Sequence, residues 1–269
     1  MDNILKDEDF NKIVRYIYNN YGIVLSNKRV LVEGKLASII ASKGFPDYST
    51  YINSIFADPS GKELSLVINK LTTNHTFFMR EPKHFEYVKS VILPYLESNS
   101  KDHDVRIWSA ACSSGEEPYS LAMTIDEYFG NRRAGWDLRI LATDIDTDVL
   151  EKATKAIYSE DSVKSLPERW IKKYFIKLSD GKYQVCDKIR KEVVFKQFNL
   201  MDKITYKKPY DLILCRNVMI YFDVKTKDSL VERFYDASKN GAYLFIGHAE
   251  NISRTTRYTY VQPAIYQKK

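Results

Sequence analysis

The first 71 residues carry apolar side chains at helical spacing. In 9–18, 27–42 and 62–71 the apolar positions recur every three or four residues, and glycine and proline residues separate these stretches. We therefore predict a small all-α domain over 1–72. A linker is expected over 73–98, in which Pro82, a favoured first-turn residue, begins a helix that runs to about Leu96.

The period changes after residue 99. Short apolar runs typical of buried strands now alternate with amphipathic helical stretches. We expect strands at 105–111, 138–143, 193–198, 210–215 and 243–247, and helices at 117–129, 146–157 and 225–238. This alternation predicts an α/β domain over 99–269 with a parallel sheet covered on both faces. A small antiparallel insert is expected at about 158–192, and a closing hairpin at 258–266.

The composition is that of a folded protein. Of 269 residues, 44% are hydrophobic and 28% charged, which is too apolar for a disordered chain. The start of the chain does not resemble a signal peptide, and no apolar run approaches the roughly 20 residues of a membrane span. We expect a cytoplasmic protein without membrane insertion. The three cysteines and four histidines are scattered, so no disulfide framework and no metal site is expected.

The charge is distributed unevenly. The chain carries a formal charge of +6, yet 99–150 holds five more acidic than basic residues, whereas 151–208 holds seven more basic than acidic ones. A nucleic-acid-binding protein concentrates positive charge around its working cleft, so no nucleic-acid partner is expected. The basic stretch is either a solvated face or a docking surface for an acidic partner.

The turn after the first predicted strand is the first place to seek a ligand site, because such sheets bind ligands at the carboxyl ends of their strands. This turn, 111–118, has a single glycine and no GxGxxG pattern. The following helix opens with Glu116 and Glu117, which disfavours an anionic dinucleotide. Either glutamate would suit an ammonium or hydroxyl group, or both complement the helix dipole.

The second predicted strand ends in two acids with separate roles. Asp144 stands where an acid takes the ribose hydroxyls of a nucleoside, and Asp146 is placed to cap the next helix. Together with the two glutamates, Asp144 suggests S-adenosylmethionine, a nucleoside without phosphates and with a sulfonium cation.

Five motifs, in order along the chain, resemble the chemotaxis receptor glutamate methyltransferases of the CheR family. They stand at 72–81, 108–120, 142–146, 215–222 and 247–251. The resemblance implies a Rossmann-like class I methyltransferase domain over 99–269 with the antiparallel insert, a linker over 73–98 that carries site residues, and a receptor-docking helical domain over 1–72. It further implies transfer of methyl from S-adenosylmethionine to receptor glutamates, giving S-adenosylhomocysteine.

The resemblance also assigns site residues. Arg80 and Tyr221 are implied beside the transferred methyl group. The implied cofactor contacts are Asn74, Thr76, Arg80, Glu117, Asp144, Asn199, Leu200, Arg216 and Asn217.

The chemistry agrees with these assignments. A glutamate side chain is ionised at pH 7, so its attack on a sulfonium methyl needs no general base. An arginine paired with the attacking carboxylate would stabilise the ground state more than the neutralising transition state, so we interpret Arg80 as an orienting residue. Phe77, Phe78, Tyr221 and Phe222 would supply a poorly solvated site, and at least two of them are expected in the core.

Two features depart from the family pattern. The second predicted helix is less rich in arginine than is usual, and offers Lys28, Arg29 and Lys35 for receptor binding. The insert around 178–184 is short and has one glycine, whereas members that bind a pentapeptide tether at the receptor C-terminus carry a longer, glycine-rich loop. We therefore expect no such tether. Association with the methyl-accepting helical bundle in receptor arrays would instead use electrostatic docking through the basic stretch 151–208.

Two other functions compete with this interpretation. The basic composition would suit methylation of nucleic acid or of a protein amine, but the residues after the fourth strand, 216–219, lack the Asn/Asp-Pro-Pro-Tyr turn of such enzymes. A non-catalytic module that senses S-adenosylmethionine or scaffolds receptors is the third possibility, and the intact site motifs argue against it.

Overall fold

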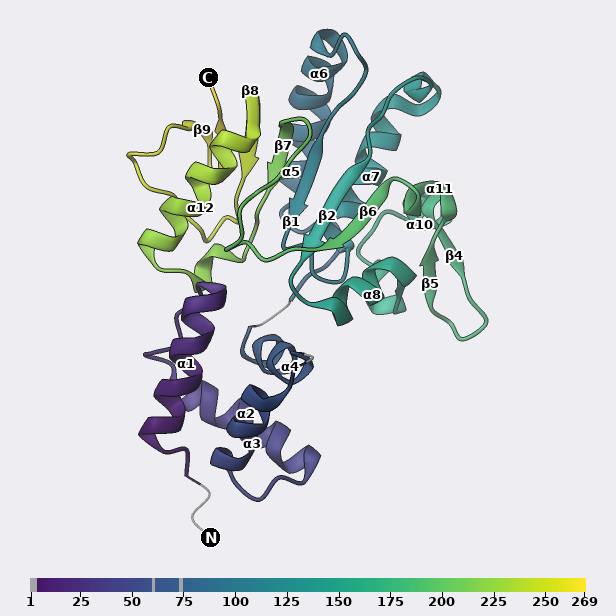
Figure 1. Ribbon diagram of the computed structural model, residues 1–269. Coiled ribbons are helices and arrows are strands. Elements are labelled where there is room, and N and C mark those ends of the chain that lie inside the picture. The colour runs from purple at the N-terminus through teal and green to yellow at the C-terminus, as the bar shows by residue number, and fades with distance from the viewer. Residues whose placement is uncertain (1–3, 60, 73–74) are drawn as a thin grey trace. The chain divides into compact units, whose positions relative to one another are not determined.

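The computed structural model describes residues 4–59, 61–72 and 75–269, which form two compact units (Figure 1). The first unit comprises the chain up to His75 together with Tyr221–Thr226, and the second comprises Thr76–Ile220 and Lys227–Lys269. None of the helices in the described ranges is long and apolar enough to cross a membrane.

The first unit is helical, as predicted. Its helices are α1 (Asp7–Tyr21), α2 (Arg29–Lys43), α3 (Tyr48–Ala57) and α4 (Lys62–Leu71). The apolar stripe of each helix is buried, which explains why its period is readable in the sequence. Helix α3 was not predicted; it is capped by Asp47, whose side chain accepts a hydrogen bond from Thr50 N at 2.7 Å. Tyr221–Thr226 joins this unit through an antiparallel bridge between Ile23 and Phe222.

The second unit is built on a seven-stranded sheet in the order β6-β2-β1-β7-β8-β10-β9. The parallel strands are β1 (Ile107–Ala110), β2 (Ile140–Asp144), β6 (Val193–Gln197), β7 (Tyr210–Leu214) and β8 (Ser238–Phe245); β9 (Thr259–Gln262) and β10 (Ile265–Gln267) form the predicted closing hairpin. The chain adds β2 and β6 on one side of β1, and β7 and β8 on the other. The order therefore reverses beside β1, which makes the carboxyl ends of β1 and β7 the switch point.

Helices accompany these strands (Figure 1). They are α5 (Pro82–Tyr87), α6 (Leu93–Asn99), α7 (Glu116–Phe129), α8 (Thr147–Lys155) and α12 (Val224–Ala237), with a π-helical turn η1 (Val88–Ile92) between α5 and α6, and short 3-10 turns η2 (Gly130–Arg133) and η3 (Met219–Tyr221). The predicted helix over 82–96 is thus one continuous helical run with a π turn inside it. Helix α7 packs on α5, η1, β2 and β6 and is buried on almost every side.

The insert forms a separate three-stranded antiparallel sheet. It contains β3 (Ile157–Tyr158), α9 (Glu160–Val163), α10 (Glu168–Tyr174), β4 (Phe175–Lys177), β5 (Tyr183–Val185) and α11 (Asp187–Arg190), with β5 in the centre of the sheet. Lys173 and Lys188 pair with the buried Asp126 of α7, and the Tyr174 hydroxyl donates to Asp126 at 3.0 Å. Part of the basic excess of 151–208 therefore binds the insert to α7 and is not available to a partner.

Candidate functional site

The turn between β1 and α7 has an unusual backbone. Ala111 and Ser113 have φ values of 63° and 49°, in the left-handed region that non-glycine residues rarely adopt. Gly115 has φ 95°, and a Cβ atom there would lie 2.9 Å from Ala153 Cβ and 3.1 Å from the Tyr158 hydroxyl. The single glycine of the motif is therefore required both by its φ and by the lack of space.

The two glutamates that open α7 have different surroundings. Glu116 is 6% exposed and accepts a hydrogen bond from Ser114 Oγ at 2.7 Å; burial raises the pKa of its carboxyl. Glu117 accepts from Ser109 Oγ at 2.7 Å and from Arg216 Nη1 at 2.9 Å. Of the two glutamates, Glu117 is the one bonded to Arg216, the residue at the end of β7. Glu117 is therefore the better candidate to bind a cationic ligand.

Asp144 ends β2 beside the same turn. Its carboxylate accepts from Ser113 N at 2.8 Å and from Asp146 N at 3.1 Å, and burial raises its pKa despite these bonds. Asp146 caps α8 as predicted, accepting from Asp148 N at 2.8 Å. The Asp144 carboxylate therefore fixes the turn after β1 next to the end of β2, in the place expected for a ribose-binding acid.

Arg216, at the end of β7, is a buried cation between two carboxylates. It donates to Glu117 from Nη1, and to Glu81 Oε2 from Nη2 at 2.9 Å and from Nε at 3.3 Å. Nη2 also donates to the backbone carbonyl of Arg80. These partners hold the guanidinium within the protein, so its first role is to join the linker to the start of α7.

Asn217 and Glu250 organise the ends of β7 and β8. Asn217 has φ 60°, and its backbone N donates to Glu250 Oε2 at 2.9 Å. The Glu250 carboxylate also accepts from Gly247 N at 2.6 Å and from Ile220 N at 3.2 Å, and burial raises its pKa. A Cβ atom on Gly247 would lie 2.3 Å from Asn217 Nδ2. Glu250 belongs to a motif recognised in the sequence, but its role was not predicted.

The linker residues are distributed between core and surface. Asn74 lies outside the described residues, and Thr76 and Arg80 are half-buried. Phe78 is in the core, 4.8 Å from the Tyr158 ring centroid, whereas Phe77 is 41% exposed. Phe222 is also buried. The expectation that at least two of the four aromatic residues are core residues is therefore confirmed.

The remaining predicted site residues are in two places. Asn199 and Leu200 follow β6; Asn199 Oδ1 accepts from Met201 N at 3.0 Å, and Leu200 is buried. Tyr221 belongs to the helical unit, where its backbone carbonyl accepts from Val24 N at 2.8 Å and its ring centroid lies 5.6 Å from Lys28 Nζ.

The basic residues of α2 differ in availability. Arg29 donates to Asp7 Oδ1 at 2.6 Å and to the Leu5 carbonyl, so it stabilises the helical unit itself. Lys35 is exposed on the helix.

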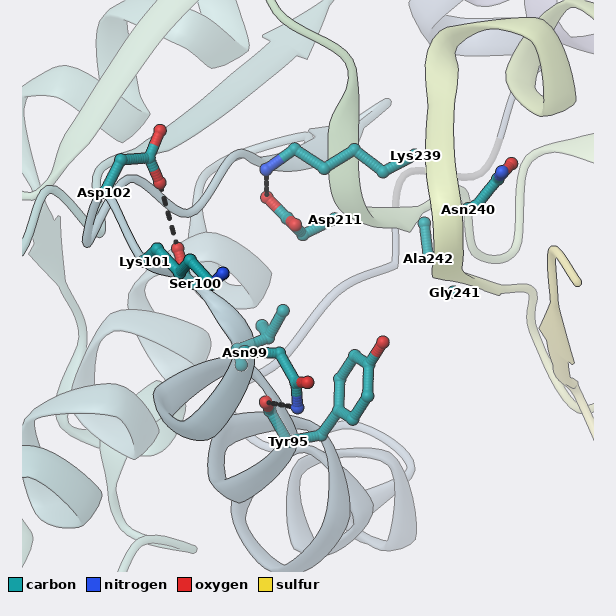
Figure 2. A pocket seen from close by; sticks show the side chains of 11 residues that line it. Tyr95, Asn99, Ser100, Lys101, Asp102, Asp211, Lys239, Asn240, Gly241 and Ala242 are labelled. Carbon is teal, nitrogen blue, oxygen red and sulfur yellow. Dashed lines mark hydrogen bonds and ion pairs between the residues drawn. The ribbon is translucent and has the colours of Figure 1, made fainter.

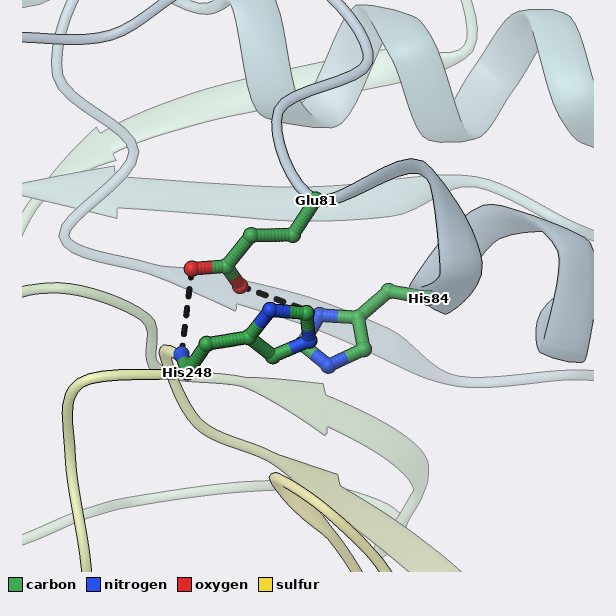
Figure 3. Close-up of side chains that lie close together, drawn as sticks. All are labelled: Glu81, His84 and His248. Carbon is green, nitrogen blue, oxygen red and sulfur yellow. Dashed lines mark hydrogen bonds and ion pairs between the residues drawn. The ribbon is translucent and has the colours of Figure 1, made fainter.

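The four histidines are scattered along the sequence, but the fold brings two of them together. His84 and His248 are separated by more than half the chain, yet their ring centroids lie 4.9 Å apart, and both are next to Glu81 (Figure 3). The spacing along the sequence gave no signal because the contact depends on β8 ending beside the start of α5.

A pocket of about 370 Å³ lies at the opposite, amino edge of the sheet. Asp211 and Lys239 line it and form an ion pair at 2.8 Å, with Tyr95, Asn99 and Gly241 around them (Figure 2). None of the predicted site residues that the structure describes lines this pocket.

The residues at the carboxyl edge fit S-adenosylmethionine. The carboxylate of Glu117 stands at the start of α7, bonded to Ser109 of β1, and that of Asp144 at the end of the adjacent strand β2. The turn 111–118 contains no lysine or arginine that would bind phosphate, and Gly115 keeps the turn close to α8. Glu117 would hold the cationic amino group, Asp144 the ribose hydroxyls, and the backbone after β6 and β7 the rest of the nucleoside.

Comparison with known proteins agrees with this fit. Residues 8–72 match the CheR methyltransferase all-alpha domain, and 74–266 match the CheR methyltransferase SAM binding domain. The chain is 45% identical to the chemotaxis protein methyltransferase of Borreliella burgdorferi, over 99% of this chain and 95% of the relative. It is 38% identical to the chemotaxis protein methyltransferase of Escherichia coli, over 94% and 87%, and to chemotaxis protein methyltransferase 2 of Vibrio cholerae, over 96% and 91%. The chain therefore belongs to the CheR family of S-adenosylmethionine-dependent methyltransferases.

Proposed function

We propose that this methyltransferase modifies glutamate side chains of the cytoplasmic helical bundle of methyl-accepting chemotaxis receptors, as part of adaptation. The observation that carries the proposal is a carboxylate-rich cofactor edge, with Glu117 at the start of α7 and Asp144 at the end of β2, in a chain that is similar over nearly its full length to chemotaxis protein methyltransferases. The products would be a glutamate methyl ester and S-adenosylhomocysteine.

The residues of the chain would bind and orient the reactants. Bound S-adenosylmethionine supplies an electrophilic methyl group, which leaves sulfur as a new carbon–oxygen bond forms to the glutamate carboxylate. Arg80 would align that carboxylate, and Tyr221 would hold it or pack beside the cation. Asn74, Thr76, Asn199, Leu200, Arg216 and Asn217 complete the proposed set of cofactor contacts. No residue needs to remove a proton, because the attacking group is already ionised.

Docking is proposed to use the helical domain. Lys35 is exposed and Lys28 is half-buried near Tyr221, so these two are better candidates than Arg29, which is engaged with Asp7. The loop between β4 and β5 is a tight turn in which Gly181 N donates to the Leu178 carbonyl at 3.1 Å. Such a short loop supports binding to the receptor bundle without a pentapeptide tether. The acidic excess of 99–150 supports the proposal that nucleic acid is not a partner, and association with cytoplasmic receptor arrays is part of the same proposal.

The test is transfer of radiolabelled methyl to a receptor cytoplasmic fragment, followed by mild alkali. An ester releases its label as volatile methanol, whereas methylated nitrogen keeps it. Alkali-labile label supports glutamate methylation. Stable label would instead indicate methylation of an amine, and absence of label across a panel of full-length receptors would contradict the proposed substrate.

A further inference from the structure

Glu81 joins three separate segments at the cofactor edge. Its Oε2 accepts from Arg216 Nη2 and Nε, and its Oε1 accepts from Asn217 Nδ2 at 3.3 Å and from the backbone N of His248 at 3.0 Å. These donors stand at the ends of β7 and β8, while Glu81 itself precedes α5. One carboxylate therefore fixes the linker to both strand ends.

The backbone around Glu81 is strained. Met79 and Glu81 both have φ 58°, in the left-handed region, and they flank Arg80. Such a conformation is unfavourable for a residue with a side chain unless the surrounding structure compensates for it. The compensation here is visible: Met79 N donates to Ser120 Oγ at 2.9 Å, Arg216 donates to the Arg80 carbonyl, and Glu81 receives its four hydrogen bonds. The position of Arg80 thus depends on Glu81 and Arg216.

Glu81 also affects the net charge of the cofactor site, because it shares the Arg216 cation with Glu117. Burial raises the pKa of Glu81, but the Arg216 cation and the hydrogen bonds from His248 N and Asn217 outweigh it, so the net pKa is lowered. Glu81 is therefore ionised at neutral pH. Arg216 then lies between two carboxylates, those of Glu81 and Glu117, and one negative charge remains for a cationic ligand. Without Glu81, the guanidinium would neutralise Glu117 alone.

The His84 ring lies against the Glu81 carboxylate. It is 1% exposed, its Nδ1 lies 3.4 Å from Glu81 Oε2, and neither ring nitrogen has a hydrogen-bond partner among the described residues (Figure 3). Burial lowers its pKa to about 3, with Arg216 adding to the effect. His84 is therefore neutral at pH 7 and does not compete with Arg216 for the carboxylate. It shields the Glu81–Arg216 pair from water, which strengthens the pair.

We propose that Glu81 is a positioning residue for cofactor binding: it holds Arg216 and Asn217 in place, so that Arg216 does not neutralise Glu117 alone and the backbone after β7 keeps its position at the S-adenosylmethionine site. This inference rests on the proposed cofactor site, in which Glu117 and Asn217 are contacts. A transition-metal ion held by Glu81, His84 and His248 is the competing interpretation of the same cluster. We favour the positioning role because the carboxylate is already neutralised by Arg216.

The experiment compares Glu81→Gln with Glu86→Gln in the full chain. The glutamine keeps the shape of the side chain, but its amide nitrogen cannot accept a hydrogen bond from Arg216. Glu86 is exposed on α5, the helix that follows Glu81, so Glu86→Gln removes an equal charge without touching the site. Calorimetry would measure the Kd of S-adenosylhomocysteine and S-adenosylmethionine, thermal unfolding would report the fold, and kinetics would give KM for the cofactor and for the receptor fragment separately.

We expect Glu81→Gln to weaken both ligands by roughly tenfold or more, because a buried charge pair loses one partner. The cofactor KM should rise in parallel, the receptor KM should stay within about twofold, and Glu86→Gln should bind like the parent. If Glu81→Gln does not fold, Glu81→Asp keeps the charge but is one methylene too short to reach both Arg216 and His248. It should then show an intermediate loss of affinity.

Three results would overturn the inference. The first is parental affinity in a folded Glu81→Gln or Glu81→Asp variant. The second is an equal rise of both KM values together with lost thermal stability, which indicates a structural role only. The third is stoichiometric zinc in the purified parent that is lost in Glu81→Gln, which assigns the cluster to a metal. A parent chain that binds neither ligand contradicts the cofactor site itself, and so is distinguishable from failure of the Glu81 role.

Discussion

Both edges of the large sheet carry clusters of charged residues, but the clusters differ in how far the paired side chains are buried. At the amino edge, Arg139 pairs with Asp137 at 2.8 Å, and the two side chains are 58% and 30% exposed. At the carboxyl edge, Arg216 is 2% exposed between its carboxylates. Exposed pairs contribute little and tolerate loss, whereas a buried pair that loses one partner leaves an uncompensated charge.

The backbone conformation also differs between the two edges. Left-handed non-glycine residues gather at the carboxyl edge: Met79, Glu81, Ala111, Ser113 and Asn217. At the amino edge this conformation is adopted by His103 and by glycines, among them Gly135 and Gly241. Strain that is maintained by buried hydrogen bonds is typical of functional sites. The pocket of Figure 2 lies at the amino edge, so the volume of a cavity does not by itself mark the functional edge of this sheet.

The largest expected effect comes from Arg80 at the carboxyl edge. Arg80→Ala should lower methyl transfer to the receptor by roughly a hundredfold or more, since the attacking carboxylate loses its alignment. The Kd of S-adenosylhomocysteine should rise by a much smaller factor, because the substitution removes one proposed cofactor contact but keeps the backbone carbonyl of residue 80 that Arg216 binds. Lys239→Ala at the amino edge is the control and should transfer methyl normally. Activity of Arg80→Ala within a fewfold of the parent would remove Arg80 from the mechanism.

A glycine at each edge gives a matched pair. At Gly247 an added Cβ would lie 2.3 Å from Asn217 Nδ2 and 2.9 Å from Asn217 N, so Gly247→Ala must displace the end of β7. At Gly241 the nearest atom is the Tyr95 hydroxyl at 2.9 Å, the end of a side chain that can rotate. We expect Gly247→Ala to reduce cofactor affinity by roughly tenfold. Gly241→Ala should lose about 1–2 kcal/mol of stability through its φ of 83° and retain full affinity.

Calorimetry would measure the affinity of both variants for the ligand, and thermal unfolding would measure their stability, which together show which edge binds the ligand. Equal losses of affinity would mean that the contrast between them does not extend to ligand binding.

Much of the carboxyl edge was predictable from local sequence. Glu117 and Asp144 each follow a buried strand, and parallel strands place their carboxyl ends at one edge, so the sequence pattern alone predicts that these two residues lie together. The helical and strand periods are readable because each element buries one face or both. Helix α3 was missed because its exposed positions hold uncharged residues such as Thr50 and Asn53, so its polar face is less distinct in the sequence than that of α4.

The parts that could not be predicted depend on strand order. The Arg216–Glu81 bond joins residues 135 positions apart, and His248 reaches Glu81 across 167 positions. Neither pairing has a local pattern, and both exist only because β7 and β8 are neighbours beside the start of α5. The left-handed conformation of Ala111 and Ser113 has no signal either, since nothing in those side chains favours it.

Substitution of Asp144 should weaken ligand binding without a large loss of stability. Asp144→Asn keeps one oxygen that can accept from Ser113 N or Asp146 N, but it removes the charge that would bind the ribose hydroxyls. We expect the Kd of S-adenosylhomocysteine to rise by roughly tenfold. Calorimetry checks this, with Asp211→Asn at the amino edge as the comparison. Unchanged affinity in Asp144→Asn would contradict the ribose-binding role.

The smallest expected effect concerns Asp137 and depends on pH. Hydrogen bonds from Arg139 lower the pKa of Asp137 to about 2, against an unfolded value of about 3.9. Because the folded pKa is the lower one, the carboxylate stabilises the fold above the unfolded value, and this contribution is lost as the pH falls through about 2. Asp137→Asn should therefore cost about 1 kcal/mol at pH 7, a figure reduced for a side chain that is 30% exposed, with methyl transfer unchanged. The free energies of unfolding of parent and variant, measured with urea, should converge as the pH falls toward 2. A difference that is constant with pH would mean that Asp137 stabilises the fold through packing, and that charge pairs do not stabilise the amino edge.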